Sequence, residues 1–137
     1  MTLIVCLDNC NGMAFNGRRQ SMDAKLRSRM LMQTQMVRLW MSPYSAKQFE
    51  ALPAYVHTAD DFLQEAKAGE ACFVELQDVA DSLQHCNKLI IYRWNRQYPA
   101  DLYFPIDILM DRFALIGQED FAGSSHERIT EEVYEVK

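Results

Sequence analysis

Short apolar runs alternate with amphipathic or polar segments along the first two thirds of the chain. The runs are rich in Ile, Val, Leu and aromatic residues, which is typical of strands. The first of them, TLIVCL, is continuously apolar, as expected for a strand that is buried in a sheet. The strands predicted from these runs lie at residues 2–7, 37–41, 54–57, 71–76 and 88–94.

Helix signals occupy the gaps between these strands. Residues 22–36 contain no Gly or Pro, and Leu26 and Met30 recur four residues apart, which predicts an amphipathic helix. Ser42 is a good N-cap and Pro43 suits the first helical position, so a second helix should begin there. The predicted helices lie at residues 22–36, 43–52, 58–69 (from a Thr58 cap with Asp61 in the capping box to Gly69) and 77–85.

After residue 94 the helix signals stop. Strands are predicted at 102–104, 112–121 and 129–136, and the GSSH segment at 123–126 reads as a turn between the last two. Strands that alternate with helices indicate a mostly parallel, twisted sheet with helices on both faces, and the tail adds an antiparallel hairpin. No linker or internal repeat is visible, so residues 1–137 are predicted to form a single α/β domain.

Composition is that of a globular protein, with 49% hydrophobic and 24% charged residues. The four cysteines are too scattered for a disulfide framework, which favours a reducing compartment. The first residues lack the positive region of a signal peptide, and no apolar run approaches the roughly 20 residues of a membrane span. We therefore expect a soluble, cytoplasmic protein without a membrane partner.

Charge is unevenly distributed. Residues 18–38 hold six basic side chains against one acid, whereas the rest of the chain holds 8 basic and 18 acidic side chains. A basic segment in an acidic protein indicates a local anionic ligand or an acidic partner, and a solvated helix face explains it equally well. The YRWNRQY stretch at 92–98 interleaves aromatic and basic residues, but an exposed strand end accounts for it, so a nucleic-acid partner is not expected.

Several chemistries find no support in the sequence. The three histidines lie far apart, with no acid or cysteine at metal-ligand spacing, so no metal site is predicted. Neither a phosphate-binding loop nor a G-x-S-x-G or G-x-G-x-x-G motif occurs. Ser125 and His126 are adjacent in the chain, which by itself is no catalytic pairing.

The loop after the first strand carries the most specific pattern. Its sequence, DNCNGMAFNGRRQS at 8–21, resembles the D-x-x-N-G-I-G-x-N-G-x-L-P-W segment of the dihydrofolate reductase family and keeps both Asn-Gly pairs. Other stretches are similar to that family at corresponding places: MSPYSA at 41–46, KLIIY at 88–92 and ADLYFP at 100–105. The resemblance spans nearly the whole chain. It implies a dihydrofolate reductase-like three-layer fold whose first loop covers a ligand site at the carboxyl ends of the parallel strands.

The same resemblance implies that the cofactor contacts of the family are missing. The glycine pair through which that family approaches the cofactor pyrophosphate corresponds to Glu75 and Leu76. The Arg and Thr that hold cofactor phosphates fall on Pro43, which has no N–H to donate, and on Ser45. No cofactor is therefore expected, with NADPH as the alternative.

The substrate side of the family's site is also changed. Its Leu-Pro-Trp run corresponds to Arg19-Gln20-Ser21, and the Thr behind the pterin corresponds to Tyr92. The family's acid on the first helix has its nearest counterpart in Asp23, three residues early. Asp23 is therefore a candidate catalytic residue. The structural alternative is that Asp23 stabilises the helix by its interaction with the helix dipole.

Three functions follow. The preferred one is a non-reductase that binds a small anionic or heterocyclic ligand. The residues assigned to this ligand site are Arg18, Arg19, Gln20, Ser21, Ser42, Ser45, Glu75 and Tyr92, together with Asp23. The first alternative is an NADPH-dependent reductase of a folate-like or pterin-like substrate with atypical cofactor contacts. The second is an interaction protein whose basic helix 22–36 docks on an acidic protein. In that case Tyr92, Trp94 and Phe15 would fill the space that corresponds to the ligand pocket of the family.

Overall fold

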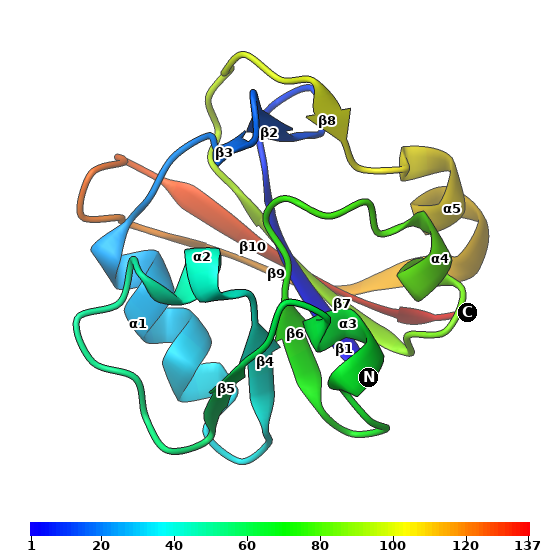
Figure 1. The fold of residues 1–137 in the computed structure, drawn as a ribbon. Coiled ribbons are helices and arrows are strands. Elements are labelled where there is room, and N and C mark those ends of the chain that lie inside the picture. Colours follow the sequence, from blue (N-terminus) through cyan, green and yellow to red (C-terminus); the bar gives the residue numbers. More distant parts are fainter.

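The computed structural model describes residues 1–137 and contains a seven-stranded sheet in the order β5-β4-β6-β1-β7-β10-β9 (Figure 1). Strands β5, β4, β6, β1 and β7 are parallel, and β10 and β9 pair antiparallel at one edge. The predicted sheet class is therefore confirmed. The strands are β1 (Thr2–Leu7), β4 (Leu39–Met41), β5 (Val56–Thr58), β6 (Ala71–Phe73), β7 (Lys88–Arg93), β9 (Phe113–Phe121) and β10 (Ile129–Val136).

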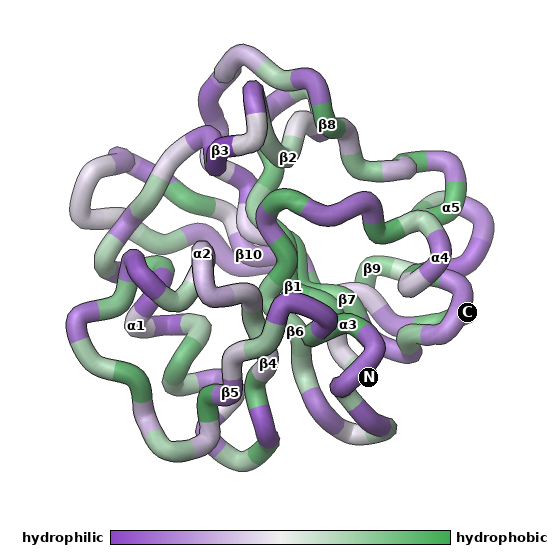
Figure 2. The backbone as a smooth tube through the Cα atoms, viewed as in Figure 1, coloured by the Kyte–Doolittle hydropathy of each residue, from purple (hydrophilic) through white to green (hydrophobic).

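Helices cover both faces of this sheet. On one face, Leu26 and Met30 of α1 pack with Ile4 and Tyr92 of the sheet. On the other face, α3, α4 and α5 pack against the opposite side chains of β1 and β7. Because the central strands β1, β6 and β7 are covered on both faces, their apolar runs show no alternation. Figure 2 shows hydrophobic residues along the central strands and hydrophilic ones in many surrounding loops. The helices are α1 (Ala24–Gln33), α2 (Pro43–Ala46), α3 (Phe62–Glu65), α4 (Ala80–Leu83) and α5 (Ile106–Arg112).

The segment predicted as a loop at 8–21 contains strands of a second sheet. This three-stranded sheet has the order β3-β2-β8, with β2 (Gly12–Phe15), β3 (Arg18–Arg19) and β8 (Leu102–Tyr103). Asn16 and Gly17 both have positive φ, 53° and 70°, which is the geometry of a tight turn between antiparallel strands. The second Asn-Gly pair is therefore a hairpin turn.

The predicted helices differ from the observed ones mainly in length. Helix α2 ends at Ala46, and α3 begins after Asp61, whose side chain makes no capping hydrogen bond, while Thr58 belongs to β5. Helix α5 was missed, because the short stretch after Pro105 shows no helical period and was assigned to the strand-rich tail. Packing against the sheet decides such short helices, since isolated helices of this length are unstable in water. None of the helices has the length and apolar character needed to cross a membrane.

Candidate functional site

The segment 8–21 crosses the carboxyl end of β1 and is held there by a buried carboxylate. One oxygen of Asp8 accepts hydrogen bonds from the N–H groups of Cys10 and Gly12, each at 2.8 Å. The other accepts from Gln20 Nε2, also at 2.8 Å. A Cβ on Gly12 would lie only 2.6 Å from the Cβ of Ala100. This glycine therefore serves the packing of the loop itself.

Arg19 points inward and forms a bidentate ion pair with Glu75. Its Nε lies 3.0 Å from Glu75 Oε2, and its Nη2 lies 3.3 Å from Oε1. The guanidinium also lies over the ring of Tyr44, 4.3 Å from the ring centroid. Both charged side chains are largely removed from water, so each neutralises the other inside the site.

Glu75 is also hydrogen-bonded to the segment around α2. Ser45 Oγ donates to Glu75 Oε1 at 2.7 Å, and Gln48 Nε2 donates to the same oxygen at 3.0 Å. Ser42 caps α2, because its Oγ accepts a hydrogen bond from the N–H of Ser45 at 3.1 Å. The family resemblance implies cofactor-phosphate contacts at Ser45. In this chain the anion that Ser45 contacts is the carboxylate of Glu75.

Asp23 caps helix α1 and also holds the loop between β9 and β10. Its Oδ1 accepts from the N–H groups of Lys25 and Leu26, at 2.9 and 3.1 Å, and from that of Ser124 at 3.1 Å. Burial by itself raises the pKa of Asp23, but hydrogen bonds from Ser125, Ser124, His126 and Leu26 outweigh it and lower this pKa well below its usual range. Asp23 is therefore an ionised, buried carboxylate. Its place at the N-cap of α1 agrees with the structural alternative, an acid that stabilises the start of the helix.

His126 connects Asp23 to Ser21. His126 Nδ1 lies 3.1 Å from Asp23 Oδ2, and its Nε2 lies 3.0 Å from Ser21 Oγ and 3.1 Å from the hydroxyl of Tyr98. Trp94 stacks on the imidazole with ring centroids 4.6 Å apart. Sequence reasoning missed this arrangement, because His126 and Asp23 are 103 residues apart in the chain.

The remaining predicted ligand residues lie apart from this centre. Arg18 is exposed on β3. Tyr92 is fully buried, and its hydroxyl donates to Gln33 Oε1 at 2.9 Å. Trp94 is buried too, as expected for a filled pocket, whereas Phe15 is 47% exposed and does not fill it.

The space between these groups is small. Arg19, Gln20, Ser21 and Glu75 line one cavity of about 10 Å³, together with Cys6, Met13, Val74 and Trp94. One water molecule needs roughly 10–15 Å³ of such volume. In this conformation the cavity has no room for a nicotinamide or a pterin ring.

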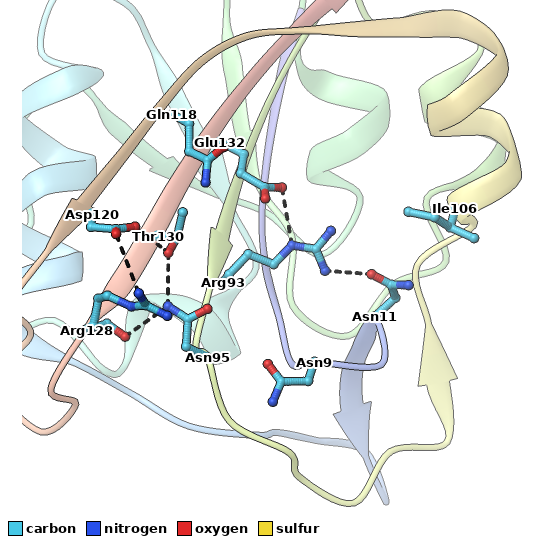
Figure 3. Close-up of a pocket in the computed structure, with 10 residues that line it drawn as sticks. All are labelled: Asn9, Asn11, Arg93, Asn95, Ile106, Gln118, Asp120, Arg128, Thr130 and Glu132. Carbon is cyan, nitrogen blue, oxygen red and sulfur yellow. Dashed lines mark hydrogen bonds and ion pairs between the residues drawn. The ribbon is translucent and has the colours of Figure 1, made fainter.

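A larger open cleft lies between the hairpin β9–β10 and the loop after β1. Its volume is about 480 Å³, and its lining residues are Asn9, Asn11, Arg93, Asn95, Ile106, Gln118, Asp120, Arg128, Thr130 and Glu132. Figure 3 shows Arg93 between Glu132 and Asn11. Its Nε donates to Glu132 Oε1 at 3.2 Å, and its Nη1 donates to Asn11 Oδ1 at 2.6 Å. No sequence pattern indicated this cleft, because its residues come from segments that only the sheet brings together.

No group of three or more His, Cys, Asp or Glu side chains gathers in a way that could hold a metal ion.

Comparison with solved structures identifies the class of fold. The dihydrofolate reductase of Enterococcus faecalis, complexed with NADP(H) and RAB-propyl, is 11% identical to this chain and superposes with a TM-score of 0.68. The match covers 99% of this chain and 95% of that one. Neither a protein-family model nor a curated protein matches the chain. The chain thus has the dihydrofolate reductase fold, which confirms the predicted fold class.

Proposed function

We propose that this chain uses the dihydrofolate reductase fold to bind a small anionic or heterocyclic ligand and does not catalyse NADPH-dependent reduction. The observation that carries this proposal is the cluster of Glu75, Arg19 and Ser45. A carboxylate already accepts the hydrogen bonds and positive charge that a phosphate would need. A cofactor phosphate brought beside Glu75 would meet a like charge in a poorly solvated place, which is strongly unfavourable.

Cavity size supports the same conclusion. Pockets for cofactors and drug-sized ligands measure about 300–1,000 Å³. The cavity at Arg19 and Ser21 is about 10 Å³, whereas the open cleft of Figure 3 is about 480 Å³. Within the cleft, the side chains of Asn9 and Gln118 have no hydrogen-bond partner in the protein, so both amides are available to match the donors and acceptors of a heterocycle. Arg93 pairs with Glu132 through Nε and with Asn11 through Nη1, so its Nη2 keeps donors for an anionic substituent.

A titration tests the absence of reductase chemistry. Purified protein is titrated with NADPH, NADP⁺, folate and dihydrofolate to millimolar concentration while the thermal midpoint is recorded. A ligand at 100 times its dissociation constant would stabilise the fold by about 2.7 kcal/mol, which is a shift of several degrees. We expect no shift. A saturable shift with NADPH would overturn the proposal and favour the reductase alternative, in which the cofactor is held by atypical contacts.

The cleft is tested separately by NMR with a panel of nucleobases, nucleosides and small dicarboxylates. Binding should perturb the amides of Asn11, Asn95 and Thr130 and should weaken at least tenfold in Arg93→Ala. Arg38→Ala is the matched control, because Arg38 lies outside the cleft, in an exposed pair with Glu70. Perturbations that map to other elements, or equal binding by the two variants, would contradict the cleft as the ligand site.

The interaction-module alternative has weaker support. Arg29, in the middle of the basic helix, pairs with Glu131 and Glu119 of the chain itself. Only Lys25 and Arg27 of α1 remain without an acidic partner. Two free cations give a weak electrostatic surface for an acidic protein.

A further inference from the structure

We propose that Ser21, His126 and Asp23 form a nucleophile, a general base and an orienting acid that hydrolyse small acyl esters. Ser21 Oγ lies 3.0 Å from His126 Nε2, and His126 Nδ1 lies 3.1 Å from Asp23 Oδ2. These contacts use the two different nitrogens of one imidazole, so they join the three side chains in one line. Both distances fall within the roughly 2.6–3.2 Å required between a nucleophile, its base and the group that orients the base.

The tautomer of His126 follows from the groups that its two nitrogens contact. Asp23 is ionised and can only accept hydrogen bonds, so the proton of a neutral His126 is on Nδ1 and is donated to Asp23 Oδ2. Nε2 then carries the free lone pair, and the hydroxyl of Ser21 donates to it. This is the tautomer that a general base for Ser21 requires. The Tyr98 hydroxyl lies 3.1 Å from the same nitrogen and helps to position the ring.

The line is rigidly held. His126 and Asp23 are only 5% and 2% exposed. Trp94 stacks on one face of the imidazole, and the N–H groups of Lys25 and Leu26 anchor the carboxylate at the start of α1. Such fixed positioning is what gives an arranged nucleophile its rate advantage.

Ser21 has both a path to substrate and free donors beside it. It is partly exposed, and its base also contacts Tyr98, which lines a groove of about 340 Å³ with Phe15 and Pro99. An alcohol or phenol leaving group fits along these aromatic and apolar side chains. The inner cavity at Ser21 is about 10 Å³, too small for an acyl group, so the acyl part must lie with the leaving group on the open side of Ser21. The N–H groups of Ser21 and Met22 donate no hydrogen bond within the protein, so they are available to a developing oxyanion.

The reaction needs only ester and water. Ser21 Oγ bonds to the carbonyl carbon while its proton passes to His126 Nε2. The bond from that carbon to the leaving oxygen then breaks, and Nε2 returns the proton to the departing alcohol. Water attacks the acyl-serine in the second half, with its proton passing through Nε2 to Ser21 Oγ, and a carboxylic acid leaves.

The test uses p-nitrophenyl acetate and a fluorophosphonate probe with the full chain. Wild type should release p-nitrophenol above the rate in buffer, and the probe should add its mass to the peptide that contains Ser21. Ser21→Ala should lower the rate at least about 100-fold and abolish labelling. This variant keeps the contacts of His126 with Asp23 and Tyr98, so its thermal midpoint should stay close to that of wild type.

Ser28→Ala is the matched control. Ser28 is an exposed serine of α1 whose hydroxyl contacts neither His126 nor Asp23. Its removal should leave ester hydrolysis and labelling within about threefold of wild type. Equal rates for wild type and Ser21→Ala, labelling at a different residue, or no hydrolysis and no labelling in wild type would each overturn the proposal. None of these outcomes bears on NADPH or on the cleft, which are tested separately.

Discussion

Asp23 holds together two segments that are distant in the chain. Its carboxylate caps α1 and accepts hydrogen bonds from the loop between β9 and β10 through Ser124 and Ser125. A side chain with so many buried partners is costly to remove, since each abandoned N–H loses its acceptor away from water. Asp23 thus has a structural role, whether or not it also takes part in catalysis.

Asp23→Ala should lower the free energy of unfolding by at least about 2 kcal/mol, from the lost cap and the unsatisfied N–H groups. Urea denaturation with a two-state fit measures this loss. Ser28→Ala, on the exposed side of the same helix, serves as the control and should change stability by less than about 0.5 kcal/mol. Equal effects of the two substitutions would show that the contacts of Asp23 do not stabilise the fold.

The charge of Asp23 should appear in the pH dependence of stability. Its pKa is lowered in the folded protein, so its contribution is fully present above the pKa of the unfolded chain, about 3.9, and is lost as the pH falls below that value. Asp23→Asn keeps a capping side chain but no charge. The stability difference between wild type and Asp23→Asn should therefore shrink between pH 6 and pH 3. A constant difference across this range would mean that the carboxylate is not selectively stabilised as an anion.

The segment 8–21 is tightly packed around Gly12. Adding a Cβ there brings it to 2.6 Å from the Cβ of Ala100 and 2.8 Å from Asp8 Oδ2. Gly12→Ala should therefore destabilise the protein by about 1–3 kcal/mol. In Gly117→Ala the new Cβ meets no atom within 4 Å, so stability should be unchanged or slightly higher. Thermal midpoints of the two variants check the contrast.

Helix α1 is joined to the C-terminal hairpin by one buried ion pair. Arg29 Nε lies 3.0 Å from Glu131 Oε2, and the guanidinium lies over the ring of Phe121. Burial raises the pKa of Glu131, but the hydrogen bonds from Arg29 outweigh it and lower this pKa overall. The ion pair thus allows the basic helix to pack on an acidic sheet edge.

Arg29→Met should therefore destabilise the fold by about 3 kcal/mol at neutral pH, because it leaves a buried carboxylate without its cation. The loss should decrease at acid pH, where Glu131 can take up a proton. Arg38→Ala is the control, since its pair with Glu70 is 3.8 Å long and half exposed, and about 0.5 kcal/mol or less is expected. Chemical denaturation at two pH values measures both. Similar losses for the two variants would contradict a structural role for the buried pair.

At the scale of the whole molecule, the four thiols report on how tightly the core is packed. Burial raises the pKa of Cys72 to about 12 and that of Cys86 to about 11. Burial and the nearby Glu75 raise the pKa of Cys6 as well. Only Cys10 is exposed. Thiolate, which is the reactive form, is therefore rare at the three other sites.

With a disulfide reagent at pH 8, we expect one of the four thiols to react rapidly and the other three only upon unfolding. Cys10→Ser should remove the fast phase. Rapid reaction of a second thiol in native protein would show that the cavity at Cys6 opens to solvent, and would weaken the argument that it is closed to a cofactor.

Much of the architecture could be predicted from the sequence, because strand runs and helix caps are local signals. The runs at 2–7 and 88–94, the cap at Ser42 and the alternation over 129–136 all identify elements that the structure contains. Short elements were predicted less well. The hairpin at Asn16 and Gly17 was assigned to a loop, and α3 and α5 were misplaced or missed, because a few residues carry too little periodicity.

The candidate site was decided only by the tertiary structure. Composition and resemblance pointed to Arg19, Ser21, Asp23 and Glu75 separately, but not to what each would contact. The ion pair of Arg19 with Glu75 joins residues 56 apart in the chain, and His126 reaches Asp23 across 103. Hydrogen bonds and ion pairs act over about 3–4 Å in space, so the sequence by itself determined which groups were available and the sheet determined which of them meet.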